Sequence, residues 1–289
     1  MCILCAKHEE LRQVIELFDG RFERQRANSV GEALYKVNGI RSLLVATCND
    51  MGHLPASVRT AQIVQNHDPR VVIFVGTAAS VNPKKVQVGD VVIPKLAISR
   101  YYDKVSESGQ ADYTDRAADS SFQEYLFERE NVLVAEVRTI KPSDEALTMV
   151  ADFDVNGQTL AAGEMGDIEI GGAKISLRNP KVHDDIDILS CGMVVDSLSY
   201  RDFLTKLMNL QYRKAQAIDM ESYGFFSALE ALRKSEVGSV THGIMVRGIS
   251  DYAGRKQQLE TLPGRWKETS VRNAASVAAD LVGRIARSF

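Results

Sequence analysis

Short apolar runs alternate with longer amphipathic stretches along the first part of the chain. Several of these runs are apolar throughout, which is typical of strands that are buried on both faces of a sheet. This order of elements predicts a mostly parallel sheet covered by helices. The expected strands are Met1–Ala6, Glu32–Val37, Ser42–Thr47, Val71–Val75 and Asp90–Pro94, and the expected helices are His8–Phe18 and Pro55–Asn66.

The pattern changes between about residues 103 and 185, where charged and polar stretches and a glycine-rich run appear. We therefore predict one domain over residues 1–289 with an insertion at about 103–185. The expected elements inside the insertion are a helix at Ser121–Arg129, a strand at Val132–Val137 and a helix after Pro142.

The α/β pattern then returns and continues to the C-terminus. In the last helix, apolar residues recur at helical spacing, so one face should pack on the sheet. The expected elements are a strand at Ile186–Val195, a helix at Arg201–Leu210, a strand at Ala215–Asp219, a helix to about Arg233, a strand at Val240–Arg247 and a helix at Ser270–Arg287.

Composition narrows the class of protein. A chain of 289 residues with 45% hydrophobic composition can bury a large core. The net charge of −3 provides no broad basic surface for nucleic acid. No apolar run is long enough to cross a membrane, and the N-terminus lacks the pattern of a signal peptide. We therefore expect a cytoplasmic protein that binds a small molecule.

The four cysteines are too few for a disulfide framework at this length. Cys2 and Cys5 have a metal-like spacing, but residues three apart on a strand point to opposite faces. No second pair completes a zinc site, so we assign them a structural role and expect no metal or organic cofactor.

Three acidic residues lie close to the ends of predicted strands. They are Glu10, Glu221 and Asp251. In open α/β sheets, ligands bind beyond the carboxyl ends of the strands. A carboxylate in such a place is more often a helix cap or a solvated group, so position alone does not establish a function.

Four segments, taken in order, resemble the successive motifs of the methylthioadenosine and S-adenosylhomocysteine nucleosidases and their purine and uridine phosphorylase relatives. They are Phe74–Ala79, Val88–Val92, Ala217–Ser222 and Val246–Asp251. The resemblance covers about residues 1–102 and 184–285. It implies an α/β fold of three layers, αβα, around a central mixed, mostly parallel twisted sheet.

The resemblance also implies a role for several residues. Glu221 would accept hydrogen bonds from the two ribose hydroxyls, as an ionised carboxylate can, and Met220 would pack on the sugar. Asp251, oriented by Ser250, would protonate the departing purine at N7. Such an acid must be protonated near neutral pH, so we predict that burial raises the pKa of Asp251.

Glu10 matches the residue that activates the attacking water in the nucleosidases, and Glu9 is the alternative if the match shifts by one residue. Two carboxyl groups on opposite faces of a sugar follow the logic of inverting glycoside hydrolysis. The sugar side of the pocket would be lined by Gly76, Thr77 and Ala78, and Tyr200 matches a position that stacks on the base.

The nucleophile is assigned from the residues that would hold phosphate. The phosphorylases carry an arginine where this chain has Phe74, and their N-terminal glycine-containing phosphate loop is missing. We therefore expect hydrolysis of the N-glycosidic bond of an adenine-type nucleoside, 5′-modified nucleoside or nucleotide. Two alternatives rest on the basic residues Lys7, Arg41 and Arg100. They could form a site for a phosphate nucleophile, and the reaction would then be phosphorolysis, or they could bind a phosphorylated substrate. A non-catalytic nucleoside sensor is a further alternative, and the resemblance implies a homodimer or larger homo-oligomer.

Overall fold

The computed structural model describes residues 1–28, 32–38, 41–107, 131–163, 165–170, 173–202, 204, 212–235, 240–254, 256 and 266–288. Within these ranges the helices are α1 (His8–Asp19), α2 (His53–His67), α4 (Asp144–Ala151), α6 (Ser222–Lys234) and α8 (Trp266–Ser288). The strands are β1 (Cys2–Cys5), β2 (Glu23–Asn28), β3 (Glu32–Val37), β4 (Arg41–Thr47), β5 (Val71–Ser80), β6 (Val91–Val92), β7 (Ala97–Glu107), β8 (Asn131–Ile140), β9 (Asp167–Ile170), β10 (Ala173–Ser176), β11 (Val182–His183), β12 (Asp187–Ser190), β13 (Ala215–Asp219) and β14 (His242–Asp251).

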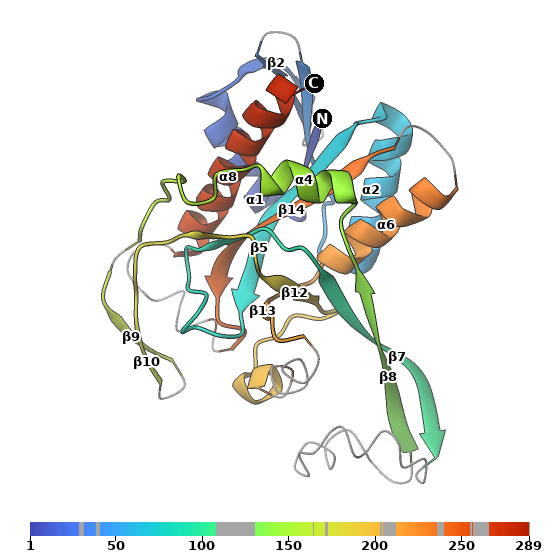
Figure 1. The fold of residues 1–289 in the computed structure, drawn as a ribbon, viewed down its shortest axis with the longest axis vertical. Helices are drawn as coiled ribbons and strands as arrows, with labels where there is room; N and C mark the ends of the chain where they lie inside the picture. The colour runs from blue at the N-terminus through green and yellow to red at the C-terminus, as the bar shows by residue number, and fades with distance from the viewer. Residues whose placement is uncertain are drawn as a thin grey trace.

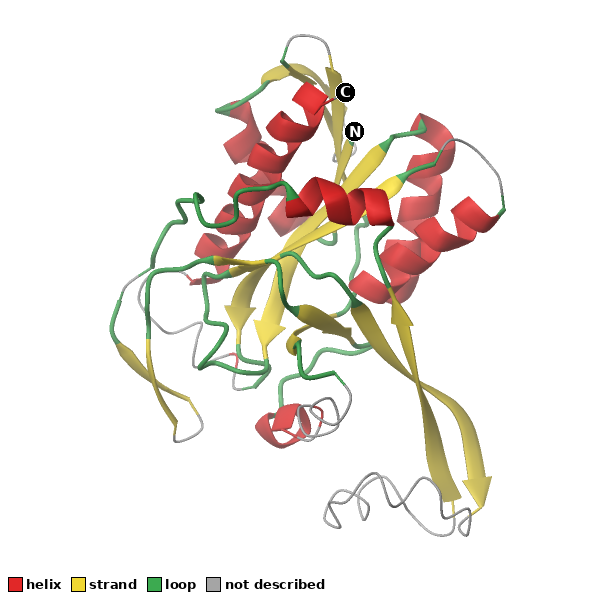
Figure 2. Cartoon of the chain, in the orientation of Figure 1, coloured by secondary structure: helices red, strands yellow, loops and turns green. Residues whose placement is uncertain are grey.

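A twelve-stranded mixed sheet forms the middle layer, and its main path runs β2-β3-β4-β1-β5-β13-β12-β7-β8. The pairs β1–β4, β1–β5, β5–β14 and β12–β13 are parallel, whereas β5 and β13 pair antiparallel. Helices α1 and α8 cover one face, and α2 and α6 cover the other (Figures 1 and 2). This three-layer architecture confirms the predicted fold class.

Two hydrophobic clusters fill the spaces between the layers. Cys5 belongs to the cluster under α1, α4 and α8, and Cys2 belongs to the cluster under α2 and α6. Because these clusters lie on opposite faces of the sheet, the two side chains point to opposite faces of β1, as predicted. Both cysteines are fully buried. None of the helices in the described ranges combines the length and the apolarity that crossing a membrane requires.

The register of three central strands brings distant segments to one edge of the sheet. Cys5 in β1 and Val246 in β14 both align with Val75 in β5. Because these strands are parallel, their carboxyl ends lie at the same edge, where ligands of such sheets collect.

Several predicted boundaries were wrong. β5 continues to Ser80, so the segment from Gly76 onwards lies on the strand and not after it. The strand expected over Asp90–Pro94 is reduced to β6, and the last helix begins at Trp266 and not at Ser270. The expected helices at Ser121–Arg129 and Arg201–Leu210 lie outside the described residues, the latter apart from its first two residues and Leu204.

Among the described elements, the strands β2, β7, β9, β10 and β11 were not predicted. The charged strand β2 pairs only with β3, at an edge of the sheet, where no apolar pattern is needed. The hairpin of β9 and β10 falls in the polar part of the predicted insertion. Other parts of that segment join the main body, because α4 packs into the core and β11 pairs with β6. The strands β7 and β8 form a long hairpin that projects from the body in Figure 1.

Candidate active site

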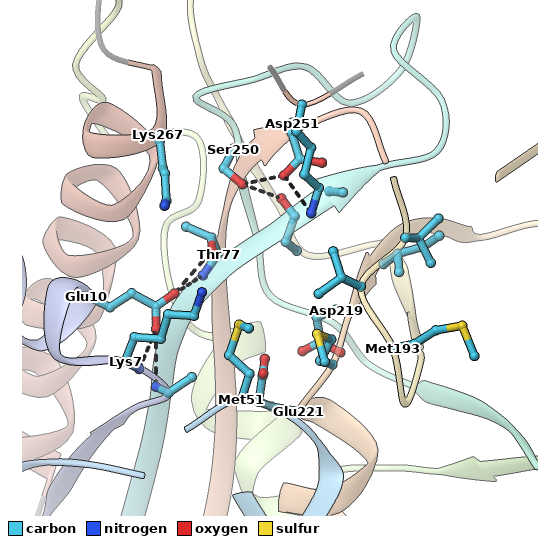
Figure 3. Close-up of a pocket in the computed structure, with 18 of the residues that line it drawn as sticks. Lys7, Glu10, Met51, Thr77, Met193, Asp219, Glu221, Ser250, Asp251 and Lys267 are labelled. Atoms are coloured by element: carbon cyan, nitrogen blue, oxygen red, sulfur yellow. Dashed lines mark hydrogen bonds and ion pairs between the residues drawn. The ribbon is translucent and has the colours of Figure 1, made fainter. Parts of the chain in front are cut away.

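A cavity of about 440 Å³ opens at the carboxyl edge of the sheet, within the size range of small-molecule sites. Glu10, Glu221 and Asp251 all line this cavity, although they come from α1, the loop after β13 and the end of β14. Figure 3 shows the three carboxylates around one space. The fold thus brings the three predicted acids together.

Glu10 is buried and is held by four donors. One oxygen accepts from the backbone amides of Ala6 and Lys7, at 3.2 Å each. The other accepts from the amide and the hydroxyl of Thr77, at 2.9 and 3.1 Å. Glu9, the alternative, has a side chain that is 74% exposed, so the geometry favours Glu10 as the residue that faces a ligand.

Glu221 is buried beside Asp219, and Arg247 lies between the two carboxylates. Nη2 of Arg247 lies 2.9 Å from an oxygen of each, and its Nε donates to Asp219 at 3.0 Å. The backbone amide of Gly52 donates to the other oxygen of Glu221 at 3.0 Å. Burial raises the pKa of Glu221 to about 7; Arg247 opposes this shift and Asp219 adds to it.

Arg247 is fully buried, and its Nη1 has no hydrogen-bond partner in the described part of the chain. A Cβ on Gly76 would lie 2.2 Å from this Nη1 and 3.0 Å from a carboxylate oxygen of Glu10. Gly76, which was expected to line the sugar side of the pocket, does not line the cavity. Its missing side chain instead leaves room for the Arg247 guanidinium to approach the Glu10 carboxylate. The sequence analysis did not assign Arg247, although a charged residue inside an apolar strand requires buried partners.

Asp251 accepts a hydrogen bond from the Ser250 hydroxyl at 2.9 Å and another from the Ala253 amide at 2.9 Å. Burial raises the pKa of Asp251, while the Lys256 ammonium, 3.8 Å away, lowers it, as do the two hydrogen bonds. The net shift is upward, as predicted from the sequence. Ser250 and Asp251 have the contact that the sequence analysis expected between them.

Of the other predicted residues, Thr77, Ala78 and Met220 line the cavity. Tyr200 does not; it packs instead against the cluster that contains Leu189 and Val195. An apolar wall of the cavity is formed by residues 193–195, which the sequence analysis included only as part of a strand. Their position directly after the carboxyl end of β12 was the available signal.

Comparison of the sequence with models of protein families gives a match over nearly the whole chain. The model of the phosphorylase superfamily matches residues 1–287. The chain belongs to this superfamily. The match confirms the resemblance that the four motifs indicated. Among curated proteins, no sequence matches the chain.

Solved structures similar to this superfamily member include the futalosine hydrolase of Helicobacter pylori, with a TM-score of 0.60 and 17% identity over 100% of this chain and 97% of that one. A 5′-methylthioadenosine/S-adenosylhomocysteine nucleosidase of Neisseria meningitidis has a TM-score of 0.57 and 18% identity, covering 98% and 97% of the two chains. A mutant nucleosidase of H. pylori with 5′-methylthioadenosine in its active site has a TM-score of 0.61 and 18% identity, and the match covers 97% of this chain and 96% of that one. At these identities the similarity concerns the fold.

The residues considered for phosphate are separated by the superfamily fold. Phe74 is buried in the core, with the Arg247 guanidinium over its ring at 4.7 Å. Arg41 opens β4, which is parallel to β1, so it lies at the opposite end of the sheet from Lys7. The backbone positions of Lys7 and Arg41 therefore do not support a shared phosphate site, and the side chains of Arg41 and Arg100 lie outside the described residues.

Proposed function

We propose that this protein is a purine nucleosidase that hydrolyses the N-glycosidic bond, with water as the nucleophile. The observation that carries the proposal is that Glu10, Glu221 and Asp251 line one cavity of nucleoside size. Each is buried or nearly so, and each is fixed by neighbouring donors. A binding protein has no need of an acid with a raised pKa beside the leaving group, which argues against the sensor alternative.

The chemistry follows from the placement of these groups. Asp251, whose pKa is raised by burial, is the group placed to donate a proton to the purine as the bond to C1′ breaks. Glu10 accepts a proton from a water molecule that attacks C1′ from the opposite face. Both oxygens of Glu221 already accept one hydrogen bond, and each retains a second lone pair for the ribose diol.

An adenine-type base is the finer part of the proposal. Residues 193–195 give the cavity an apolar wall suited to the face of a purine, and Met193 lies on the side away from Glu10 in Figure 3. Two of the similar structures are named for nucleosidases of 5′-methylthioadenosine. Phosphorolysis remains the second candidate, although Phe74 offers no donor to a phosphate nucleophile.

The test is release of free base from adenosine, methylthioadenosine, S-adenosylhomocysteine, inosine and ATP, with and without inorganic phosphate. We expect base release that does not depend on phosphate. Release only with phosphate would establish a phosphorylase, and tight binding without release would establish a sensor. Glu10→Gln should lower the rate with the best substrate about 100-fold or more. Glu16→Gln, exposed on the same helix and outside the cavity lining, serves as the matched control.

A further inference from the structure

Three lysines line the cavity among the described residues: Lys7, Lys256 and Lys267. Lys7 directly precedes α1 and Lys267 lies at the start of α8, and these two helices pack against each other. Figure 3 shows the side chains of Lys7 and Lys267 on the Glu10 side of the cavity, with Met193 on the opposite side. One wall of the site therefore carries two ammonium groups.

The orientation of a bound nucleoside indicates what these lysines would face. In ribose, C5′ is attached to C4′, on the other side of the ring oxygen from C1′, which bears the base. A nucleoside with its diol on Glu221 and its base beside Asp251 directs C5′ away from both carboxylates. The wall that remains holds Lys7 and Lys267 together with Glu10, whose carboxylate accepts hydrogen bonds from the amides of Ala6 and Lys7 and from Thr77.

We infer, on the basis of the proposed nucleosidase function, that the substrate is a purine nucleotide whose 5′-phosphate is bound by Lys7 and Lys267. Lys7 is partly buried, and its ammonium has no hydrogen bond or ion pair to any other described residue. An uncharged 5′ group, such as a thioether, would cover this ammonium and provide no acceptor. A phosphate oxygen provides a charged acceptor.

The acidic groups nearby are compatible with a phosphate at this wall. Lys267 pairs with Glu9 at 3.5 Å, and both side chains are more than half exposed, so a phosphate can replace this pair. Asp219 and Glu221 share the charge of Arg247 on another side of the site. Glu268, the residue after Lys267 on α8, also lines the cavity and is exposed to solvent.

Lys256 has a different position from the other two lysines. Its ammonium lies 3.8 Å from Asp251, and its amide donates to Asp196, so it belongs to the base side of the cavity. We therefore leave it out of the phosphate subsite.

The reaction is balanced without a further reactant: the bond from C1′ to the purine breaks, and a bond from C1′ to the water oxygen forms. Asp251 gives its proton to the base, Glu10 takes one from water, and the products are free base and ribose 5-phosphate.

The experiment compares kcat/KM for AMP and adenosine in the same preparations of wild type, Lys7→Met, Lys267→Met and Lys234→Met. Lys234 lies on α6, is 70% exposed and pairs with Glu230, so it is the control. Because both substrates are measured on one sample, the ratio does not depend on the fraction of folded protein. We expect the wild type to prefer AMP, and each cavity variant to lower the AMP-to-adenosine ratio about tenfold or more. The control should keep the wild-type ratio.

Each other outcome overturns a specific statement. If adenosine is cleaved as well as AMP, or neither cavity variant changes the ratio, the phosphate subsite is wrong while the nucleosidase function stands. If adenosine cleavage requires inorganic phosphate and yields ribose 1-phosphate, the lysines bind a nucleophile and not a substrate. If no nucleoside or nucleotide releases base, the proposed function fails, and this inference fails with it.

Discussion

Replacing Arg247 with methionine would remove the buried cation that lies between Asp219 and Glu221. Both carboxylates are at most 6% exposed in their side chains, and each lies 2.9 Å from Nη2 of Arg247. Methionine keeps the approximate length of the side chain but offers no donor. The change therefore leaves two buried carboxylates with no cation between them.

The expected loss of stability follows from burial. Removing one partner of a buried ion pair costs about 3–5 kcal/mol, because an uncompensated charge remains in the interior. For a chain of this length the entropy of unfolding is about 0.6 kcal/mol/K, so the Tm should fall by about 5–8 °C. The loss should exceed that of any exposed pair in the protein.

The loss should also depend on pH. The pKa of Glu221 is already raised to about 7, and Arg247 lowers it, so removal of Arg247 raises it further. A carboxyl group whose folded pKa lies above its unfolded value loses stability as pH rises between the two values. The wild type completes this loss near pH 7, whereas the variant continues to lose stability above pH 7. The difference between them should grow by up to about 1.4 kcal/mol per pH unit over that range.

Urea unfolding at pH 6.5 and pH 8.5 measures both quantities. The control is Arg21→Met, because Arg21 pairs with Asp280 on the surface, where both side chains are more than a third exposed, and its loss should be below about 1 kcal/mol. The reasoning is refuted if Arg247→Met destabilises no more than Arg21→Met. It is also refuted if the gap between variant and wild type is the same at both pH values.

Three further variants test the site. Asp251→Asn should lower kcat about 100-fold to 10,000-fold with a smaller change in KM, since a general acid acts mainly in the transition state; a kcat near wild type would remove Asp251 from its role. Lys256 lowers the pKa of Asp251, so Lys256→Met should move the alkaline limb of the kcat–pH profile to higher pH. The control Lys234→Met should leave that limb in place. An unchanged limb in Lys256→Met, or a shift to lower pH, would contradict the prediction. Gly76→Ala should lower both the rate and the stability, the latter by about 1–3 kcal/mol in thermal unfolding, because the new Cβ would meet Nη1 of Arg247; unchanged stability would show that the guanidinium can move freely.

Alternation of apolar runs with amphipathic stretches predicted a mostly parallel sheet covered by helices, because burial on both faces of a sheet imposes a local pattern. The arrangement in three layers was implied by the resemblance of the four motifs. The same pattern placed Glu10 and Asp251 close to the ends of strands. It did not predict the charged edge strand β2, which pairs on one side only and needs no apolar pattern. It also ended β5 too early, because Gly76 and the small residues after it do not resemble a strand.

The sequence by itself determined the order of the motifs and the acids that they carry, since each motif is a continuous segment. Only the tertiary structure decided which of these groups meet. The pairing of Arg247 with Glu221 and its approach to Gly76 depend on the register of β1, β5 and β14. The presence of Lys7 and Lys267 in one cavity depends on the packing of α1 against α8. Periodicity along a chain reports whether a side chain is buried, but not which distant side chain it contacts.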